Sequence, residues 1–70
     1  SDMLHSYIVE LKYAKSKDTD AHVEQLRQEA ISQVNRYAES EVVTSAIKTT
    51  QLHKIIVVYK GTEMVVCEEV

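Results

Sequence analysis

The chain contains no proline, tryptophan or phenylalanine, and only one glycine and one cysteine. A lone cysteine cannot form a disulfide within the chain, so the composition gives no sign of an oxidising compartment. One glycine is too few for the phosphate-cradling loop of an ATPase, which excludes that activity from these residues. No apolar run approaches the ~20 residues that cross a bilayer, and no signal peptide is visible. These absences predict a cytoplasmic protein without a membrane partner.

The length of 70 residues allows one domain at most, and we expect residues 1–70 to belong to one domain. A chain this short buries only about 60% of its unfolded surface, so its core is small. Apolar residues make up 44% of the chain, enough for a core and too many for a disordered segment. The formal net charge of −3 argues against an autonomous nucleic-acid binder, because such proteins usually carry a basic excess.

Hydrophobic periodicity predicts three strands. About residues 5–13 alternate between two faces, with Tyr7, Val9, Leu11 and Tyr13 on one and Ser6, Ile8, Glu10 and Lys12 on the other. Residues 52–60 are apolar on both faces around residues 55–58, which is typical of a central strand covered on both sides. Gly61 predicts a tight turn into a partner strand, which completes a C-terminal β-hairpin.

Helical periodicity predicts one long helix, about residues 20–39, with Thr19 or Asp20 as its N-cap. Its apolar stripe consists of Val23, Leu26, Ala30, Val34 and Tyr37. Residues 41–49 predict a shorter helix. The fold class is therefore α+β, with about three strands and the long helix packed on a small sheet.

Glu10 and Lys12 are candidate catalytic residues, because positions i and i+2 of a strand share a face. On such a strand a carboxylate can hold a divalent metal, and a lysine can stabilise charge that develops on phosphate. The alternative is a solvated strand face where opposite charges are neighbours.

Gln33 and Tyr37 form the second candidate pair, one turn apart on the same face of the predicted helix. The glutamine could reach over the polar face of the first strand, and the tyrosine hydroxyl could orient a catalytic group. The alternative is a boundary glutamine beside a core tyrosine whose hydroxyl reaches water. His5, His22 and His53 show no metal-ligand spacing, and Cys67 is interpreted as a packing residue.

The order E-x-K on a strand, then Q-x-x-x-Y on the next helix, resembles the PD-(D/E)XK nuclease superfamily in its RecB-like branch. The segments "HSYIVELKY", "QVNRYA" and "LHKIIVVYKGTEMVVCEEV" are similar to the C-terminal nuclease-like domain of bacterial proteins with an AAA-ATPase-like N-terminal region. The resemblance implies a partial restriction-endonuclease-like core. It also implies catalytic roles for Glu10, Lys12, Gln33 and Tyr37, with Mg²⁺ held by Glu10 and the Leu11 carbonyl.

The superfamily's first acidic residue lies on the strand before E-x-K, but only nine residues precede Glu10. Asp2 follows a serine rather than a proline and is too close for a separate strand. The chain is therefore expected to be the C-terminal half of a nuclease-like domain, inactive alone, whose longer parent hydrolyses phosphodiesters of nucleic acid. The alternatives are a non-catalytic module that regulates an AAA-ATPase-like region, and a small α+β interaction domain unrelated to nucleases. The exposed edge and apolar face of a partial sheet predict a homodimer.

Overall fold

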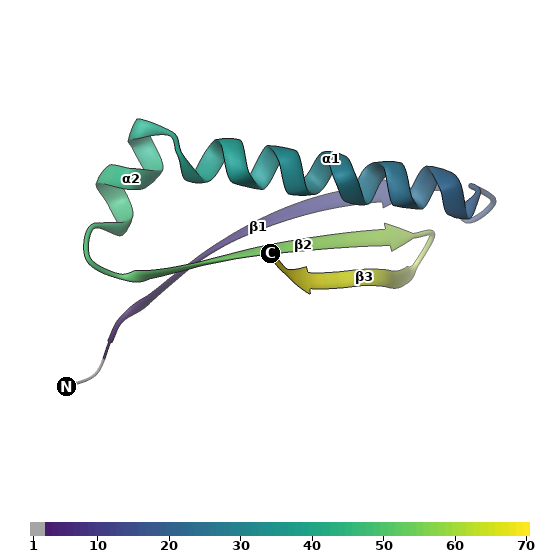
Figure 1. Cartoon of the computed structure of the whole chain (residues 1–70). Helices are drawn as coiled ribbons and strands as arrows, with labels where there is room; N and C mark the ends of the chain where they lie inside the picture. Colours follow the sequence, from purple (N-terminus) through teal and green to yellow (C-terminus); the bar gives the residue numbers. More distant parts are fainter. Residues whose placement is uncertain (1–2) are drawn as a thin grey trace.

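The computed structural model describes residues 3–70 as a sheet with one long and one short helix (Figure 1). The elements follow the chain as β1 (His5–Ala14), α1 (Asp20–Ala38), α2 (Glu41–Ile47), β2 (Gln51–Lys60) and β3 (Glu63–Glu69). The predicted α+β class is confirmed, and each predicted element is present with ends shifted by one or two residues. No described helix is long and apolar enough to cross a membrane.

The three strands form one mixed sheet in the order β1-β2-β3. β2 lies in the centre, as predicted, and pairs in parallel with β1 and antiparallel with β3. The β2–β3 turn contains Gly61 at φ 60°, a left-handed conformation that suits a residue without a side chain. A Cβ added to this glycine would lie 3.1 Å from Cβ of Ser16, in the loop that leaves β1. The single glycine therefore allows the hairpin turn and the end of β1 to lie close together.

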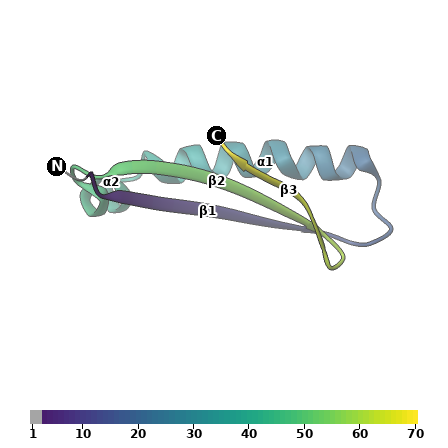
Figure 2. The same cartoon turned by 90° about the horizontal axis from the view of Figure 1, so that it is seen from below.

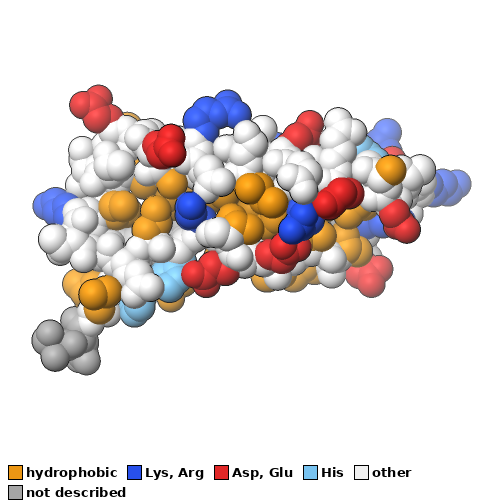
Figure 3. Space-filling model, viewed as in Figure 1, with side chains coloured by type: hydrophobic (Ala, Val, Ile, Leu, Met, Phe, Trp, Pro, Cys, Tyr) orange, Lys and Arg blue, Asp and Glu red, His pale blue; other side chains and the backbone are white. Residues whose placement is uncertain are grey.

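Helix α1 runs along the length of the sheet and covers one of its faces (Figure 1). Thr19 is its N-cap, because the side-chain hydroxyl of Thr19 accepts a hydrogen bond from the backbone N–H of His22 at 3.1 Å. Ala30 and Val34 on α1 pack against Ile56 on β2, and these three side chains are fully buried. In Figure 3 hydrophobic side chains form a band between the helix and the strands, interrupted by charged side chains. The core is thus a small apolar layer between α1 and the sheet.

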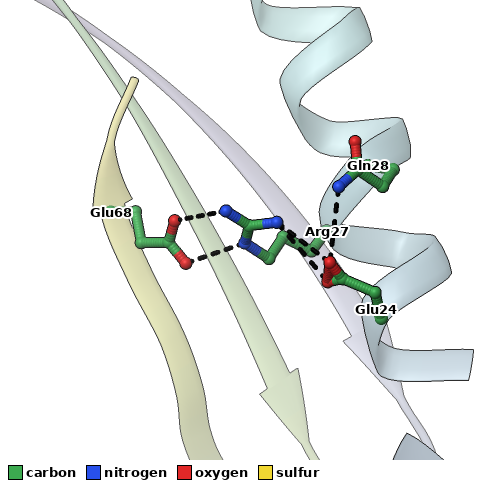
Figure 4. A network of polar contacts seen from close by, with 4 residues as sticks. All are labelled: Glu24, Arg27, Gln28 and Glu68. Atoms are coloured by element: carbon green, nitrogen blue, oxygen red, sulfur yellow. Dashed lines mark hydrogen bonds and ion pairs between the residues drawn. The ribbon is translucent and has the colours of Figure 1, made fainter. Parts of the chain in front are cut away.

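An ion pair between Arg27 and Glu68 fastens α1 to the edge strand β3 (Figure 4). Nε and Nη2 of Arg27 donate to the two carboxylate oxygens of Glu68 at 2.8 and 2.9 Å, and Nη1 donates to Glu24 at 3.0 Å. The hydrogen bonds from Arg27 hold the pKa of Glu68 below its usual value of 4.5, and they raise the pKa of Arg27 in turn. A bidentate geometry of this kind fixes orientation better than a single contact.

The second face of the sheet carries no helix among the described residues, as the view from below shows (Figure 2). The prediction that the central strand is covered on both sides is therefore wrong for this face. Val57 is buried there only by its neighbours within the sheet, Leu11 on β1 and Cys67 on β3. We call this surface the open face. The reason is that residues 3–70 contain one long helix, and one helix covers one face.

Candidate active site

An open groove of about 340 Å³ lies where β1, the end of α1 and the start of α2 meet. It is lined by Glu10, Gln33, Arg36, Tyr37 and Ser40. Three of the four residues predicted to be catalytic therefore share one concave surface, although they come from two elements that are far apart in the sequence.

The local structure explains why these side chains meet. Alternation along β1 directs Glu10 toward the face that α1 covers, and its side chain is half-buried there. Gln33 and Tyr37 lie one helical turn apart on the same side of α1, which is the side above β1. Tyr37 is 52% exposed, so it ends the apolar stripe at the groove and is not a core residue. The predicted geometry, with this helix pair over the face that presents Glu10, is the geometry of the structure.

Lys12 lies on the same sheet face as Glu10, by alternation, and is half-buried. It does not line the groove, however, and no described ion pair joins it to Glu10. The structure therefore brings Glu10, Gln33 and Tyr37 together and leaves Lys12 two residues further along the strand.

The Leu11 side chain lies on the open face, so only its backbone carbonyl is available to a ligand near Glu10. The backbone N–H of Gln51 donates to the Leu4 carbonyl at 2.9 Å, which sets the phase of the parallel ladder. Even-numbered residues of β1 direct their backbone groups to β2, and odd-numbered residues direct theirs to the free edge. The Leu11 carbonyl consequently points to the free edge of β1.

Arg36 is a groove residue that sequence reasoning missed. Helical periodicity places it away from the apolar stripe, on the polar side of the helix. An arginine there is usually an ordinary solvent-exposed residue and does not indicate a functional site. In the described part of the chain it forms no ion pair, and neither does Glu10. The groove therefore contains one carboxylate and one guanidinium, and each is free to contact a bound molecule.

A model of the PD-(D/E)XK nuclease superfamily matches residues 1–69. The chain belongs to this superfamily. No curated protein and no solved structure shows significant similarity to it. Enzymes of the superfamily generally use divalent metals such as Mg²⁺, so the groove has to be tested as a metal site.

The described residues meet the needs of a superfamily metal site only in part. Mg²⁺ prefers six oxygen ligands in near-octahedral geometry. The Glu10 carboxylate and the Leu11 carbonyl could supply two oxygens. Within residues 3–70, no three histidine, cysteine or acidic side chains are grouped so that they could hold a metal ion. Asp2 lies outside the described residues. These residues alone do not make the full ligand set.

The histidines do not contribute to the groove. Nδ1 of His5 lies 2.8 Å from Nε2 of His53, and Nδ1 of His53 lies 2.9 Å from a Glu69 carboxylate oxygen, all on the open face. The Tyr7 ring stacks on His53 with centroids 4.9 Å apart. Sequence reasoning treated the histidines as scattered, and the parallel register brings two of them together. Cys67, interpreted as a packing residue, lies beside Val57 on the same face with its side chain exposed.

Proposed function

We propose that this chain supplies the second acidic residue, the lysine and the helix pair of a metal-dependent nuclease site, in the RecB-like branch with Q-x-x-x-Y. The observation that carries the proposal is the shared groove of Glu10, Gln33 and Tyr37. A solvated strand face with neighbouring charges gives no reason for a glutamine and a tyrosine from a helix to meet the carboxylate.

Each candidate site residue has a defined task in this proposal. Glu10 and the Leu11 carbonyl would supply two ligands of the metal ion, which would activate water and neutralise charge. Gln33 and the Tyr37 hydroxyl would orient the carboxylate once the site is loaded, and Lys12 would stabilise negative charge on the phosphate. Arg36 adds a planar donor that suits phosphate oxygens, and the half-exposed Tyr37 ring offers a surface on which a base can stack. The substrate class is therefore nucleic acid.

The incomplete ligand set leads to a specific expectation for the 70-residue chain. With one carboxylate and one carbonyl, metal affinity is low and water is poorly positioned for attack. We expect no cleavage by this chain alone. Cleavage requires a further carboxylate at the free edge of β1, supplied by a longer protein that contains this chain.

The test is a nuclease assay with Mg²⁺ or Mn²⁺ on plasmid and single-stranded substrates. It compares the 70-residue chain, a longer protein that contains it, and the Glu10→Ala and Lys12→Ala variants of both. The longer protein should cleave, and each substitution should abolish cleavage. Lys48→Ala, on the surface beyond α2, is the matched control and should leave the rate unchanged. A longer protein that fails to cleave any substrate would contradict the proposal, and cleavage by the 70-residue chain, abolished by both substitutions, would contradict the missing carboxylate.

The second candidate is a non-catalytic module that couples to an AAA-ATPase-like region through protein contacts. The absence of a three-ligand group within residues 3–70 and the net charge of −3 favour it. The same assay separates the two candidates, since a non-catalytic module gives a longer protein that is inert with every metal. Glu10→Ala would then leave the ATPase rate of that protein unchanged.

A further inference from the structure

We propose that the open face is the interface of a twofold dimer in which a second copy of this chain lies on it, sheet against sheet. The apolar stripe of β1 makes up one side of this face, and its four side chains are all exposed: Tyr7, Val9, Leu11 and Tyr13. Met64, which pairs with Tyr59, and Val65, which precedes the partly buried Val66, extend the exposed apolar surface onto β3. An apolar patch of this kind is often an interaction site.

The described chain is long and flat for its length. The Cα atoms have a radius of gyration of 14.0 Å and principal extents of 46 × 24 × 14 Å. A compact chain of this length has a radius of gyration of about 11 Å. The molecule is therefore a thin plate of one helix on one sheet. A second plate against the open face would turn two solvent-facing sheets into the interior of a four-layer particle.

The exposed side chains of the open face supply much of the area that a specific pair needs. The six exposed side chains of the face are between 39% and 69% exposed. With about 150–250 Å² for a whole tyrosine and about 60–120 Å² for an aliphatic side chain, they offer about 300–500 Å² per copy. Two copies bury about 600–1,000 Å² through these side chains alone, and half-buried Ile55 and Tyr59 add more. Specific interfaces begin at about 1,000 Å² in total.

Charge and twist favour an identical partner. The centre of the open face carries no charged side chain, so two copies meet there without like-charge repulsion, although each chain has a net charge of −3. The charged groups of the face lie at one end, where Glu69 is already paired with His53. Two sheets with the same twist pack in the aligned arrangement at about −30°. The stacked Tyr13 and Tyr59 rings, 5.8 Å apart, give the other end a broad flat aromatic surface.

The dimer is independent of the proposed nuclease role, because the groove lies on the opposite side of the sheet. Face-to-face pairing leaves both grooves on the outer surfaces. It also differs from pairing through the free edge of β1, which would leave the open face in water.

The test measures the molar mass of the chain by analytical ultracentrifugation from low micromolar to millimolar concentration, without metal or nucleic acid. The wild-type chain should be a dimer at the upper concentrations. Val9→Lys places a charge at the centre of the open face and should raise the dimer dissociation constant by more than about 100-fold. Val42→Lys, at an exposed valine of α2, is the matched control and should leave the dissociation constant within about threefold of wild type.

Circular dichroism checks that both variants keep wild-type helix content. If Val9→Lys fails to fold, Tyr13→Glu serves as the second variant, because Tyr13 is the most exposed residue of the stripe. A wild-type chain that stays monomeric throughout the range overturns the proposal and leaves the face to a different partner. A dimer that survives both open-face substitutions overturns it in favour of edge pairing.

Discussion

Beneath α1, the sheet presents Glu10, Lys12 and Lys54 among its side chains, whereas the open face presents tyrosine, valine and leucine to solvent. A small α+β domain usually has few charged residues under the helix and polar residues on the face in water. Lys54 is accommodated because its Nζ donates to the Asn35 side chain of α1 at 2.7 Å. Glu10 has no comparable partner among the described residues.

The contrast shows where packing and function compete. Polar residues that stand in a covered position without partners lower stability, and proteins retain them mainly at functional sites. Apolar residues that stand in an open position also lower fitness, through aggregation, unless something covers them. One face therefore indicates a site and the other an interface, and each deviation from the usual pattern can be tested by substitution.

The largest expected effect is a loss of stability on substitution of a buried isoleucine of β2, compared with its half-buried neighbour. Ile56 is fully buried under α1, and Ile55 is half-buried on the open face. Ile56→Ala should lower the free energy of unfolding by about 2–5 kcal/mol, through lost burial and a residual cavity. That is a large share of the roughly 4–10 kcal/mol expected for a domain of this length.

Ile55→Ala is the matched control and should cost about 1 kcal/mol in the monomer, since much of that side chain is already in water. Urea denaturation at low protein concentration measures both values. Equal losses in the two variants would show that the open face is buried even in the monomer, and the contrast between the faces would then disappear.

The contrast was only partly predictable from the sequence. Period-2 alternation is local, so it assigned Glu10 and Lys12 to one face of β1 and the tyrosines to the other. The cap at Thr19 and the turn at Gly61 are also local, and both were found. Alternation does not say which face a helix covers, and the run of apolar residues in β2 suggested cover on both faces.

The groove and the histidine contact depend on long-range pairing. His5 meets His53 because β1 and β2 pair in parallel with Tyr7 opposite His53, and no spacing within either strand reveals that register. Arg36 and Ser40 line the groove because of how α1 ends above β1. The Gln33 and Tyr37 pair was predicted from its one-turn spacing, and the resemblance implied its catalytic role, whereas helical periodicity alone placed Tyr37 in the apolar stripe.

The next effect tests whether Glu10 is kept at a cost to stability. Glu10→Leu should raise the free energy of unfolding by about 0.5–1.5 kcal/mol, because an apolar side chain beside Ile8 and Ile56 replaces a half-buried carboxylate without a described partner. Glu63→Leu, at the exposed start of β3, is the control and should change stability by less than about 0.5 kcal/mol. Loss of stability in Glu10→Leu would mean that the carboxylate has a structural partner.

The smallest expected effect is on the pH dependence of stability. It concerns the ion pair at the edge of the sheet, where Arg27 of α1 binds Glu68 of β3. The pKa of Glu68 is lower in the folded chain than its usual value of 4.5, so the folded state binds fewer protons than the unfolded state around that pH. The stabilisation is therefore fully present above about pH 4.5 and is lost as the pH falls through the folded-state pKa. Wild-type Tm should fall by a few degrees more than Glu68→Gln Tm when the pH is lowered from about 7 to about 3.

Asp18 adds to the acid sensitivity of both proteins, because hydrogen bonds led by that from the Lys15 backbone N–H lower its pKa in the folded state. The difference between the pH profiles of Tm of wild type and Glu68→Gln therefore isolates the contribution of the Arg27–Glu68 ion pair. Glu29→Gln, on α1 and outside the described ion pairs, is the control and should follow the wild-type pH profile. Identical profiles for wild type and Glu68→Gln would mean that the pair exchanges freely with water. Apolar packing between α1 and β2 would then hold the helix on the sheet without a contribution from this ion pair.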